Sequence, residues 1–138
     1  MEIEIITIGD ELLIGQVIDT NSAWMGQLLE SEGFRVVRRT TVRDDRQDLL
    51  EAFKSAMDRT SIVLVTGGIG PTKDDITKKT LCEFFESSVH FSEEVYQNIK
   101  NIYCCKGRVM NELTRLQAMV PDLCTVIQNK AGTAPCTW

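Results

Sequence analysis

The sequence has 138 residues, of which 43% are hydrophobic and 25% are charged, enough apolar material for one globular domain with a core. Its formal net charge is −5 and it contains no basic run, so we expect no nucleic-acid partner and no anionic membrane as partner. The first residues carry Glu2 and Glu4 within an apolar run, unlike a signal peptide, and no apolar run is long enough to span a bilayer. Composition therefore predicts a cytoplasmic domain.

The cysteines show no metal-binding or disulfide pattern. They number five, include no CxxC pair, and are accompanied by a single histidine, His90. We expect most of them to be small buried side chains in a reducing cytosol. His90 is expected in an apolar loop and cannot form a Ser/His/Asp or Cys/His arrangement. The cysteines are Cys82, Cys104, Cys105, Cys124 and Cys136.

The first third of the chain predicts a strand, a connection and a helix. Residues 2–8 are predicted to form the first strand, which ends in Gly9-Asp10-Glu11. In the connection from Leu12 to Asp19, Gly15 breaks any regular helix. A helix follows from about Asn21 to Glu32, with Trp24 and Met25 expected in the core. Its N-cap is one of the residues 19–22, and Gly33 ends it.

A second strand and a second helix come next. Phe34 to Val42 is the strand, and Arg38 with Arg39 indicates that it lies near a sheet edge. Arg43-Asp44-Asp45 then leads into a helix over Arg46 to Asp58, whose apolar residues recur at helical spacing.

The next segment, IVLVTGGIGPTKDDITKKTL, predicts a third strand followed by a glycine turn. Ile62 to Val65 form an uninterrupted apolar run, as in a strand buried on both faces of a parallel sheet. A helix opens near Asp74 and ends near Phe85. Free N–H groups in such a turn and the helix dipole favour an anion. The glycines are Gly67, Gly68 and Gly70.

The remaining pattern is looser. Ser92 is expected to cap a helix that runs to Tyr103, and a short helix is expected around Asn111 to Met119. Pro121-Asp122 leads into a strand at Thr125 to Gln128. Lys130 to Trp138 is expected to be a loop without a core of its own.

The order strand-helix-strand-helix-strand-helix predicts an α/β fold with a parallel sheet and helices on both faces. Ligands of such sheets bind at the carboxyl ends of the strands. Three acidic pairs follow the strands, and clustered carboxylates require a cation or a proton between them. With phosphate nearby, Mg²⁺ or a related hard cation explains them, although acidic residues also favour helix first turns for dipole reasons alone. The pairs are Asp10-Glu11, Asp44-Asp45 and Asp74-Asp75.

Further polar residues near this edge each have two interpretations. Thr72 and Thr77 either donate hydroxyl hydrogen bonds to a phosphate or cap the helix, and Asn21 either orients a sugar hydroxyl or caps its helix. Lys73 is the nearest cation, whereas Lys78 and Lys79 suit a solvated helix face. The predicted ligand contacts are Gly9, Asp10, Asn21, Gly67, Gly68, Gly70, Thr72, Asp74 and Thr77.

Several motifs resemble a known family. The segment from Thr66 to Thr80, TGGIGPTKDDITKKT, resembles the signature of the molybdopterin-binding fold of MoaB, MogA and the gephyrin G domain. GDELL-x-G followed by DTN, together with NELTRLQAMVP and NKAGTAP, looks like the amino-terminal domain of the CinA (competence/damage-inducible) proteins. The resemblance covers residues 1–138.

The resemblance implies a three-layer α/β/α sandwich with a mostly parallel sheet, and self-association as dimers or trimers. In CinA-type proteins it implies metal-dependent hydrolysis of ADP-ribose to AMP and ribose 5-phosphate, with Mg²⁺, Mn²⁺ or Co²⁺ as cofactor. The positions that match the family's motifs are Asp44, Asp75 and the glycine turn. We expect Asp44 and Asp75 to be catalytic, and Asp75 with Asp10 to hold the metal ion. Two alternatives stay open, a molybdopterin-binding or adenylylating enzyme and a non-catalytic nucleotide-binding or scaffolding module.

The sequence also departs from the family pattern. Cys136 replaces the last glycine of GTAPG, and the chain stops at Trp138, before the PGxP segment of its relatives. The linker domain and the nicotinamide-mononucleotide deamidase domain of longer CinA proteins are absent from it. We therefore expect a domain that lacks its carboxyl-terminal portion and has no deamidase activity.

Overall fold

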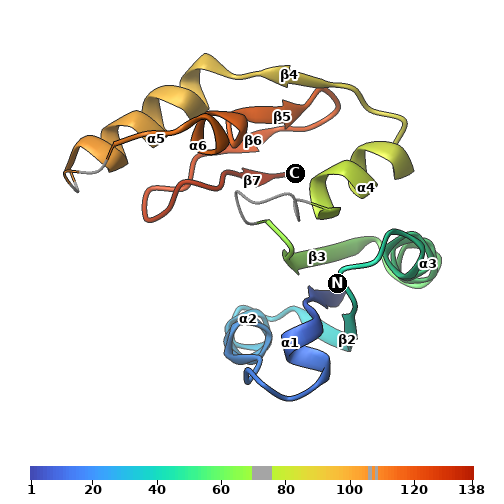
Figure 1. Ribbon diagram of the computed structural model, residues 1–138. Coiled ribbons are helices and arrows are strands. Elements are labelled where there is room, and N and C mark those ends of the chain that lie inside the picture. The colour runs from blue at the N-terminus through green and yellow to red at the C-terminus, as the bar shows by residue number, and fades with distance from the viewer. Residues whose placement is uncertain (70–75, 106, 108) are drawn as a thin grey trace. The chain divides into compact units, whose positions relative to one another are not determined.

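The computed structural model describes residues 1–69, 76–105, 107 and 109–138 (Figure 1). They form two compact units, Met1–Ile69 and Gly70–Trp138, and each is described by itself. None of the helices in these ranges combines the length and the apolar character that crossing a bilayer requires.

The first unit is built on a parallel sheet of β1 (Glu2–Ile8), β2 (Arg35–Val42) and β3 (Ile62–Gly67), in the order β2-β1-β3. This confirms the predicted parallel sheet. β2 lies at an edge, as its arginines indicated. The central strand β1 is the one buried on both faces, with Ile5 and Ile6 at 0% exposure, because it has a neighbour on either side. β3, predicted to be fully buried, is half-buried along its whole length.

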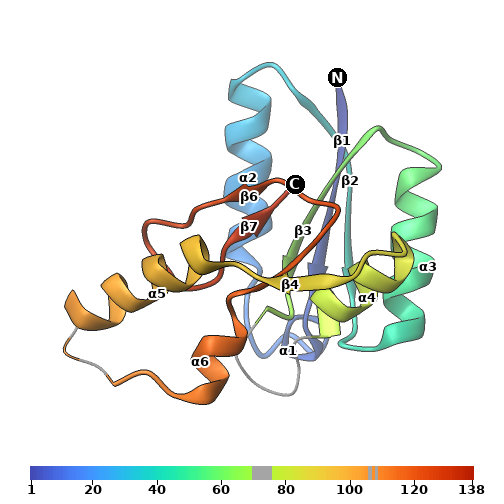
Figure 2. The ribbon, with the colours of Figure 1, turned by 90° about the horizontal axis from the view of Figure 1, so that it is seen from above.

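Two helices cover the opposite faces of this sheet, α2 (Thr20–Ser31) and α3 (Arg46–Met57), as Figures 1 and 2 show. Both were predicted from the spacing of their apolar residues. Leu49, Phe53 and Ala56 point from α3 into the core and are buried. Asp45 caps α3 by accepting hydrogen bonds from two backbone N–H groups of its first turn.

Two expectations for the first unit were wrong. A short helix, α1 (Asp10–Leu13), occupies the start of the connection that was expected to be irregular, and Gly15, at φ +72°, lies just beyond its end. Trp24 was expected in the core but is 61% exposed on α2. The apolar residues of α2 are spread around the helix and define no narrow stripe, so spacing could not tell which of them face the sheet.

The second unit contains three helices and two small antiparallel sheets within the described residues. Its core consists of Val95, Ile99, Ala118 and Val120. Ser92 caps its longest helix, as predicted, by accepting a hydrogen bond from the Val95 N–H. The helices are α4 (Ile76–Phe84), α5 (Glu93–Cys105) and α6 (Glu112–Leu116), and the sheets pair β4 (Val89–Phe91) with β5 (Met119–Pro121) and β6 (Val126–Ile127) with β7 (Cys136–Thr137).

Three predictions for this unit need correction. Lys130 to Trp138 is not a plain loop, because β7 pairs with β6 and the backbone of Trp138 exchanges hydrogen bonds of 2.6 and 2.9 Å with Thr125. His90 lies in β4, where its Nδ1 is 2.6 Å from Asp122 Oδ1. All five cysteines are at least partly accessible, and three of them are exposed. Strands of two or three residues are too short to show an alternating pattern.

Candidate functional site

The strands of the first unit end at one level. Ile8, the last residue of β1, is in register with Val42 of β2 and with Gly67 of β3. The Gly9 N–H donates to the Val42 carbonyl at 3.1 Å, which ties the ends of β1 and β2 together. The three segments that follow the strands therefore begin side by side, at the carboxyl edge where ligands of parallel sheets bind.

Two of the predicted acidic residues meet at this edge. The Asp10 backbone N–H donates to Asp44 Oδ2 at 3.2 Å, although the two residues are separated by 34 positions in the sequence. The Asp44 carboxylate thus accepts a hydrogen bond at the start of α1, where Gly9 offers no side-chain cap. The second oxygen of Asp44 and the exposed Asp10 carboxylate are left as oxygen ligands for a cation at this edge of the sheet.

The glycines after β3 allow a close approach of backbones. Gly67 has φ +100°, and a Cβ at this position would lie 2.0 Å from the Ile8 carbonyl oxygen. Only glycine fits there, because such a contact is far inside van der Waals distance. Gly68, at φ +59°, continues the left-handed backbone. The chain therefore turns sharply at the end of β3, where only glycine can pass this close to Ile8.

A polar cluster on the α2 face of the sheet was missed by the sequence interpretation. Asp19 caps α2, with its Oδ1 3.0 Å from the Ser22 N–H and its Oδ2 accepting a hydrogen bond from the Ser22 hydroxyl. Arg39 Nη1 donates to the same hydroxyl at 3.4 Å. Two residues further along β1 and β2, the hydroxyls of Thr7 and Thr41 are 2.9 Å apart. Asp19 was noted only as one cap candidate among four, since neighbours that are distant in the sequence give no signal before folding.

Burial by itself would raise the pKa of the Asp19 carboxyl, but the surrounding donors outweigh it. Hydrogen bonds from the Ser22 side chain and backbone, a hydrogen bond from Thr7 and the charge of Arg39 together hold this pKa below its ordinary value of 3.8. A lowered pKa in the folded state means that the ionised carboxylate stabilises the fold.

We expect Asp19→Asn to destabilise the protein above pH 4 and to lose that effect in more acidic solution. The contribution of a carboxyl with a lowered pKa is present above its unfolded value of 3.8 and disappears as the pH falls through the folded value. Urea unfolding at pH 6 and at pH 3.5 measures this difference. Asp19→Ala should cost about 1 kcal/mol more at pH 6, since asparagine still caps a helix and alanine does not. An Asp19→Asn effect that is equal at both pH values would contradict the interpretation.

The other predicted ligand contacts are distributed as follows. Asn21 is exposed in the first turn of α2 and is not the cap, which leaves its amide available. Thr77 is buried in the first turn of α4, in the second unit. Gly70, Thr72, Asp74 and Asp75 lie outside the described residues, so the predicted role of Asp75 stays a prediction.

Within the described residues, no group of three or more His, Cys, Asp or Glu side chains is arranged to hold a metal ion. Mg²⁺ and similar hard cations are commonly held by one or two carboxylates plus ligand phosphates. The donor chemistry of the Asp10–Asp44 pair fits that mode, because both residues supply carboxylate oxygens.

Comparisons with known proteins agree with this fold. Residues 4–126 match the family model of a probable molybdopterin binding domain. A CinA-like protein of Cytophaga hutchinsonii is 45% identical over 98% of this chain, which spans about a third (32%) of that relative. The crystal structure of CinA from Thermoplasma acidophilum superposes with a TM-score of 0.86 at 31% identity, over 99% of this chain and 79% of that one.

A solved structure with a lower sequence identity shares the same fold. MoaB of Thermus thermophilus, a molybdopterin biosynthesis enzyme, has a TM-score of 0.58 at 17% identity, over 87% of this chain and 78% of that one. At this identity the likeness concerns the fold alone. The match of the family model over most of the chain and the agreement with a CinA structure lead to one conclusion: the chain belongs to the family of molybdopterin-binding-type domains, and within it to the CinA-like proteins.

Proposed function

We propose that this domain hydrolyses the diphosphate bond of ADP-ribose in a metal-dependent reaction and releases AMP and ribose 5-phosphate. The observation that carries the proposal is the hydrogen bond from the Asp10 backbone N–H to Asp44 Oδ2 at the carboxyl edge of the sheet. Diphosphate hydrolysis needs oxygen donors for a cation, a group that takes a proton from water and uncovered donors for phosphate oxygens. The resemblance to CinA proteins supplies the choice of ADP-ribose.

Phosphate binding, proton transfer and cation binding fall to different residues of the chain. Backbone N–H groups of Gly67 and Gly68, together with the segment that follows them, bind the phosphate oxygens. Asp44 is fixed by the Asp10 N–H on one oxygen, and its other oxygen accepts the proton of the attacking water. Asp10 and Asp75 hold the divalent cation, which supplies Lewis-acid activation of a phosphoryl group and a lowered pKa of water when it is bound.

The atoms balance in a single displacement. The water oxygen forms a bond to one phosphorus, and the bond from that phosphorus to the bridging oxygen breaks. AMP and ribose 5-phosphate each leave with one phosphate. The proton of the water goes to Asp44 and from there to solvent. Asn21 donates to a sugar hydroxyl and sets the orientation of the nucleotide.

Incubation of the protein with ADP-ribose and Mg²⁺, Mn²⁺ or Co²⁺ should release AMP, measured by chromatography. Asp44→Asn and Asp75→Asn are expected to lower the rate by about 100-fold, the usual contribution of a proton-accepting group or of a cation ligand. Asp58→Asn provides the matched control, because Asp58 follows α3 at the far end of that helix and its replacement should leave AMP release unchanged.

Other outcomes would favour other functions. The family model describes a probable molybdopterin binding domain, which gives a pterin ligand and its adenylylation as the second candidate, with the same edge of the sheet as its site. Binding of pterin without AMP release would favour that candidate. Binding of ADP-ribose without turnover would indicate a non-catalytic nucleotide-binding or scaffolding module.

Size-exclusion chromatography with light scattering tests the proposed homodimer or homotrimer.

A further inference from the structure

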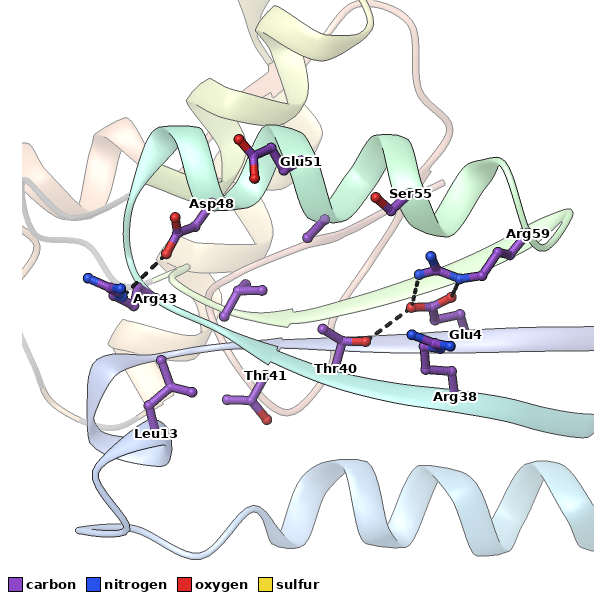
Figure 3. A pocket seen from close by; sticks show the side chains of 12 residues that line it. Glu4, Leu13, Arg38, Thr40, Thr41, Arg43, Asp48, Glu51, Ser55 and Arg59 are labelled. Carbon is purple, nitrogen blue, oxygen red and sulfur yellow. Dashed lines mark hydrogen bonds and ion pairs between the residues drawn. The ribbon is translucent and has the colours of Figure 1, made fainter.

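A second polar concavity lies in the first unit, between the edge strand β2 and helix α3. This β2–α3 groove has a volume of about 450 Å³ (Figure 3), within the range of about 300–1,000 Å³ that small-molecule sites occupy. Its Glu4 end lies about 16 Å from the carboxyl edge, since Glu4 precedes Gly9 by five residues along β1. Its other end reaches that edge, because its lining there includes Leu13, Val42 and Arg43. Its lining includes Glu4, Arg38, Thr40, Arg43, Asp48, Glu51 and Arg59.

One end of the groove is organised around the carboxylate of Glu4, which is 1% exposed. Arg59 donates to both of its oxygens, from Nε at 3.0 Å and from Nη2 at 2.8 Å, and the Thr40 hydroxyl donates to it at 3.1 Å. A buried carboxylate with these partners is satisfied and fixes the plane of the guanidinium. Arg59 is thereby held in one orientation at the wall of the groove, with its side chain 38% exposed.

The same end of the groove carries more positive charge than Glu4 neutralises. Arg59 uses two of its N–H groups on Glu4, so the other donors of its guanidinium remain available. Arg38 extends beside Glu4 (Figure 3) and forms no hydrogen bond or ion pair with any residue of the described ranges. Two guanidinium groups therefore face the Glu4 carboxylate here, and Asp58, outside the lining of the groove, attracts Arg59 more weakly than Glu4 does.

At the opposite end of the groove, negative charge exceeds positive charge. Arg43 Nε is 3.3 Å from Asp48 Oδ2, and Glu51 lies nearby on the same helix. Two carboxylates face one guanidinium there. An anion that enters the groove is therefore repelled from the Asp48 end and attracted to the end that carries Arg38.

We propose that the β2–α3 groove binds an oxyanion, a carboxylate or phosphate group of a small ligand, between Arg38 and the unused N–H donors of Arg59. A planar guanidinium binds such groups by two parallel hydrogen bonds, and a partner that is already fixed loses little side-chain entropy on binding. Glu4 positions Arg59 for this task and does not itself touch the ligand. The anion position at the Arg38 end of the groove thus shares no residue with the proposed diphosphate chemistry.

Titration of the ¹⁵N-labelled protein with inorganic phosphate, and separately with citrate, at constant ionic strength tests this proposal. The Nε–Hε resonances of Arg38 and Arg59 should shift and saturate, and the anion with the lower dissociation constant identifies the preferred group. Arg38→Ala should weaken binding about tenfold, the usual consequence of losing a charge-assisted hydrogen bond. Arg38→Lys keeps the positive charge but loses the two parallel N–H donors of the guanidinium, so it should restore only part of the affinity for the anion.

Arg35→Ala is the matched control. Arg35 lies on the same strand and pairs with the exposed Glu2 at 3.3 Å, outside the lining of the groove, so its loss should leave anion binding unchanged. Equal weakening by Arg35→Ala and Arg38→Ala, or shifts that do not saturate, would mean general charge screening and would overturn the proposal. Asp44→Asn, expected to slow AMP release, should not alter these titrations, which separates the two sites.

Discussion

An Arg59→Met variant should be much less stable than the original protein at pH 8 and only slightly less stable at pH 5. Methionine keeps the apolar stem of the side chain but removes the ion-pair partner of the Glu4 carboxylate, which is 1% exposed and forms no ion pair with the neighbouring Arg38. A buried carboxylate without such a partner binds a proton at higher pH than it does in the unfolded chain, where its pKa is about 4.3. We expect the thermal midpoint at pH 8 to fall by roughly 10 °C.

The sign of the pH dependence follows from linkage. In the variant, the folded state holds a proton that the unfolded state has released, so stability falls as the pH rises from 5 to 8. Thermal unfolding by circular dichroism at both pH values measures the midpoint, and hydrogen exchange of the β1 amides localises the loss to the first unit.

Glu4→Gln in the Arg59→Met background is the matching control. It removes the buried charge, so the double variant should regain part of the lost stability at pH 8 and should show no added pH dependence. Equal midpoints of Arg59→Met at pH 5 and pH 8, each measured against the original protein, would show that water replaces the guanidinium beside Glu4.

The second large effect is expected from Gly67→Ala. The added Cβ would stand 2.0 Å from the Ile8 carbonyl oxygen, and the backbone at φ +100° is strained for any residue with a side chain. The ends of β1 and β3 must then separate, at a cost of about 3 kcal/mol or more in the free energy of unfolding. Urea unfolding measures that cost. AMP release should fall with it, since the carboxyl edge would no longer align.

Gly26→Ala distinguishes this steric effect from a general effect of glycine replacement. Gly26 lies within α2, and a Cβ there meets nothing within 4 Å. Alanine is the better helix former, so this variant should gain about 0.5–1 kcal/mol. Similar unfolding midpoints for the Gly67 and Gly26 variants would contradict the close approach at the end of β3.

The sheet and its two covering helices were predictable because each leaves an apolar run or a group of apolar residues in the sequence, bounded by turn or capping residues. β1, β3 and α3 appear in the sequence as apolar runs or helical spacings, and the arginines of β2 indicated its edge position. The order of these elements also predicted that Asp10 and Asp44 would lie at the same edge, which the hydrogen bond of 3.2 Å confirms.

The polar interactions of the first unit were not predictable, because they join residues that are far apart in the sequence. The sequence showed Glu4 only as an acidic residue within an apolar run, because its partner Arg59 is 55 positions away. Asp19 gave only a capping signal, although its surroundings include Thr7 and Arg39 from two different strands. Only tertiary contacts reveal such groups.

The short elements were missed for a different reason. β7 has two residues and α1 has four, and neither length shows a period. Trp24 was placed in the core on hydrophobicity alone, but a surface always carries some large apolar side chains. Hydrophobicity is therefore a weak indicator of burial for a single residue.

The distribution of the five cysteines has a practical consequence. All of them lie in the unit that runs from Gly70 to Trp138, with Cys104, Cys105 and Cys136 exposed, and the unit from Met1 to Ile69 contains none. A maleimide dye therefore labels one half of the chain and leaves the other chemically untouched. Trp24, exposed on α2, is the sole tryptophan of the unlabelled half and can serve as the fluorescence donor for that dye.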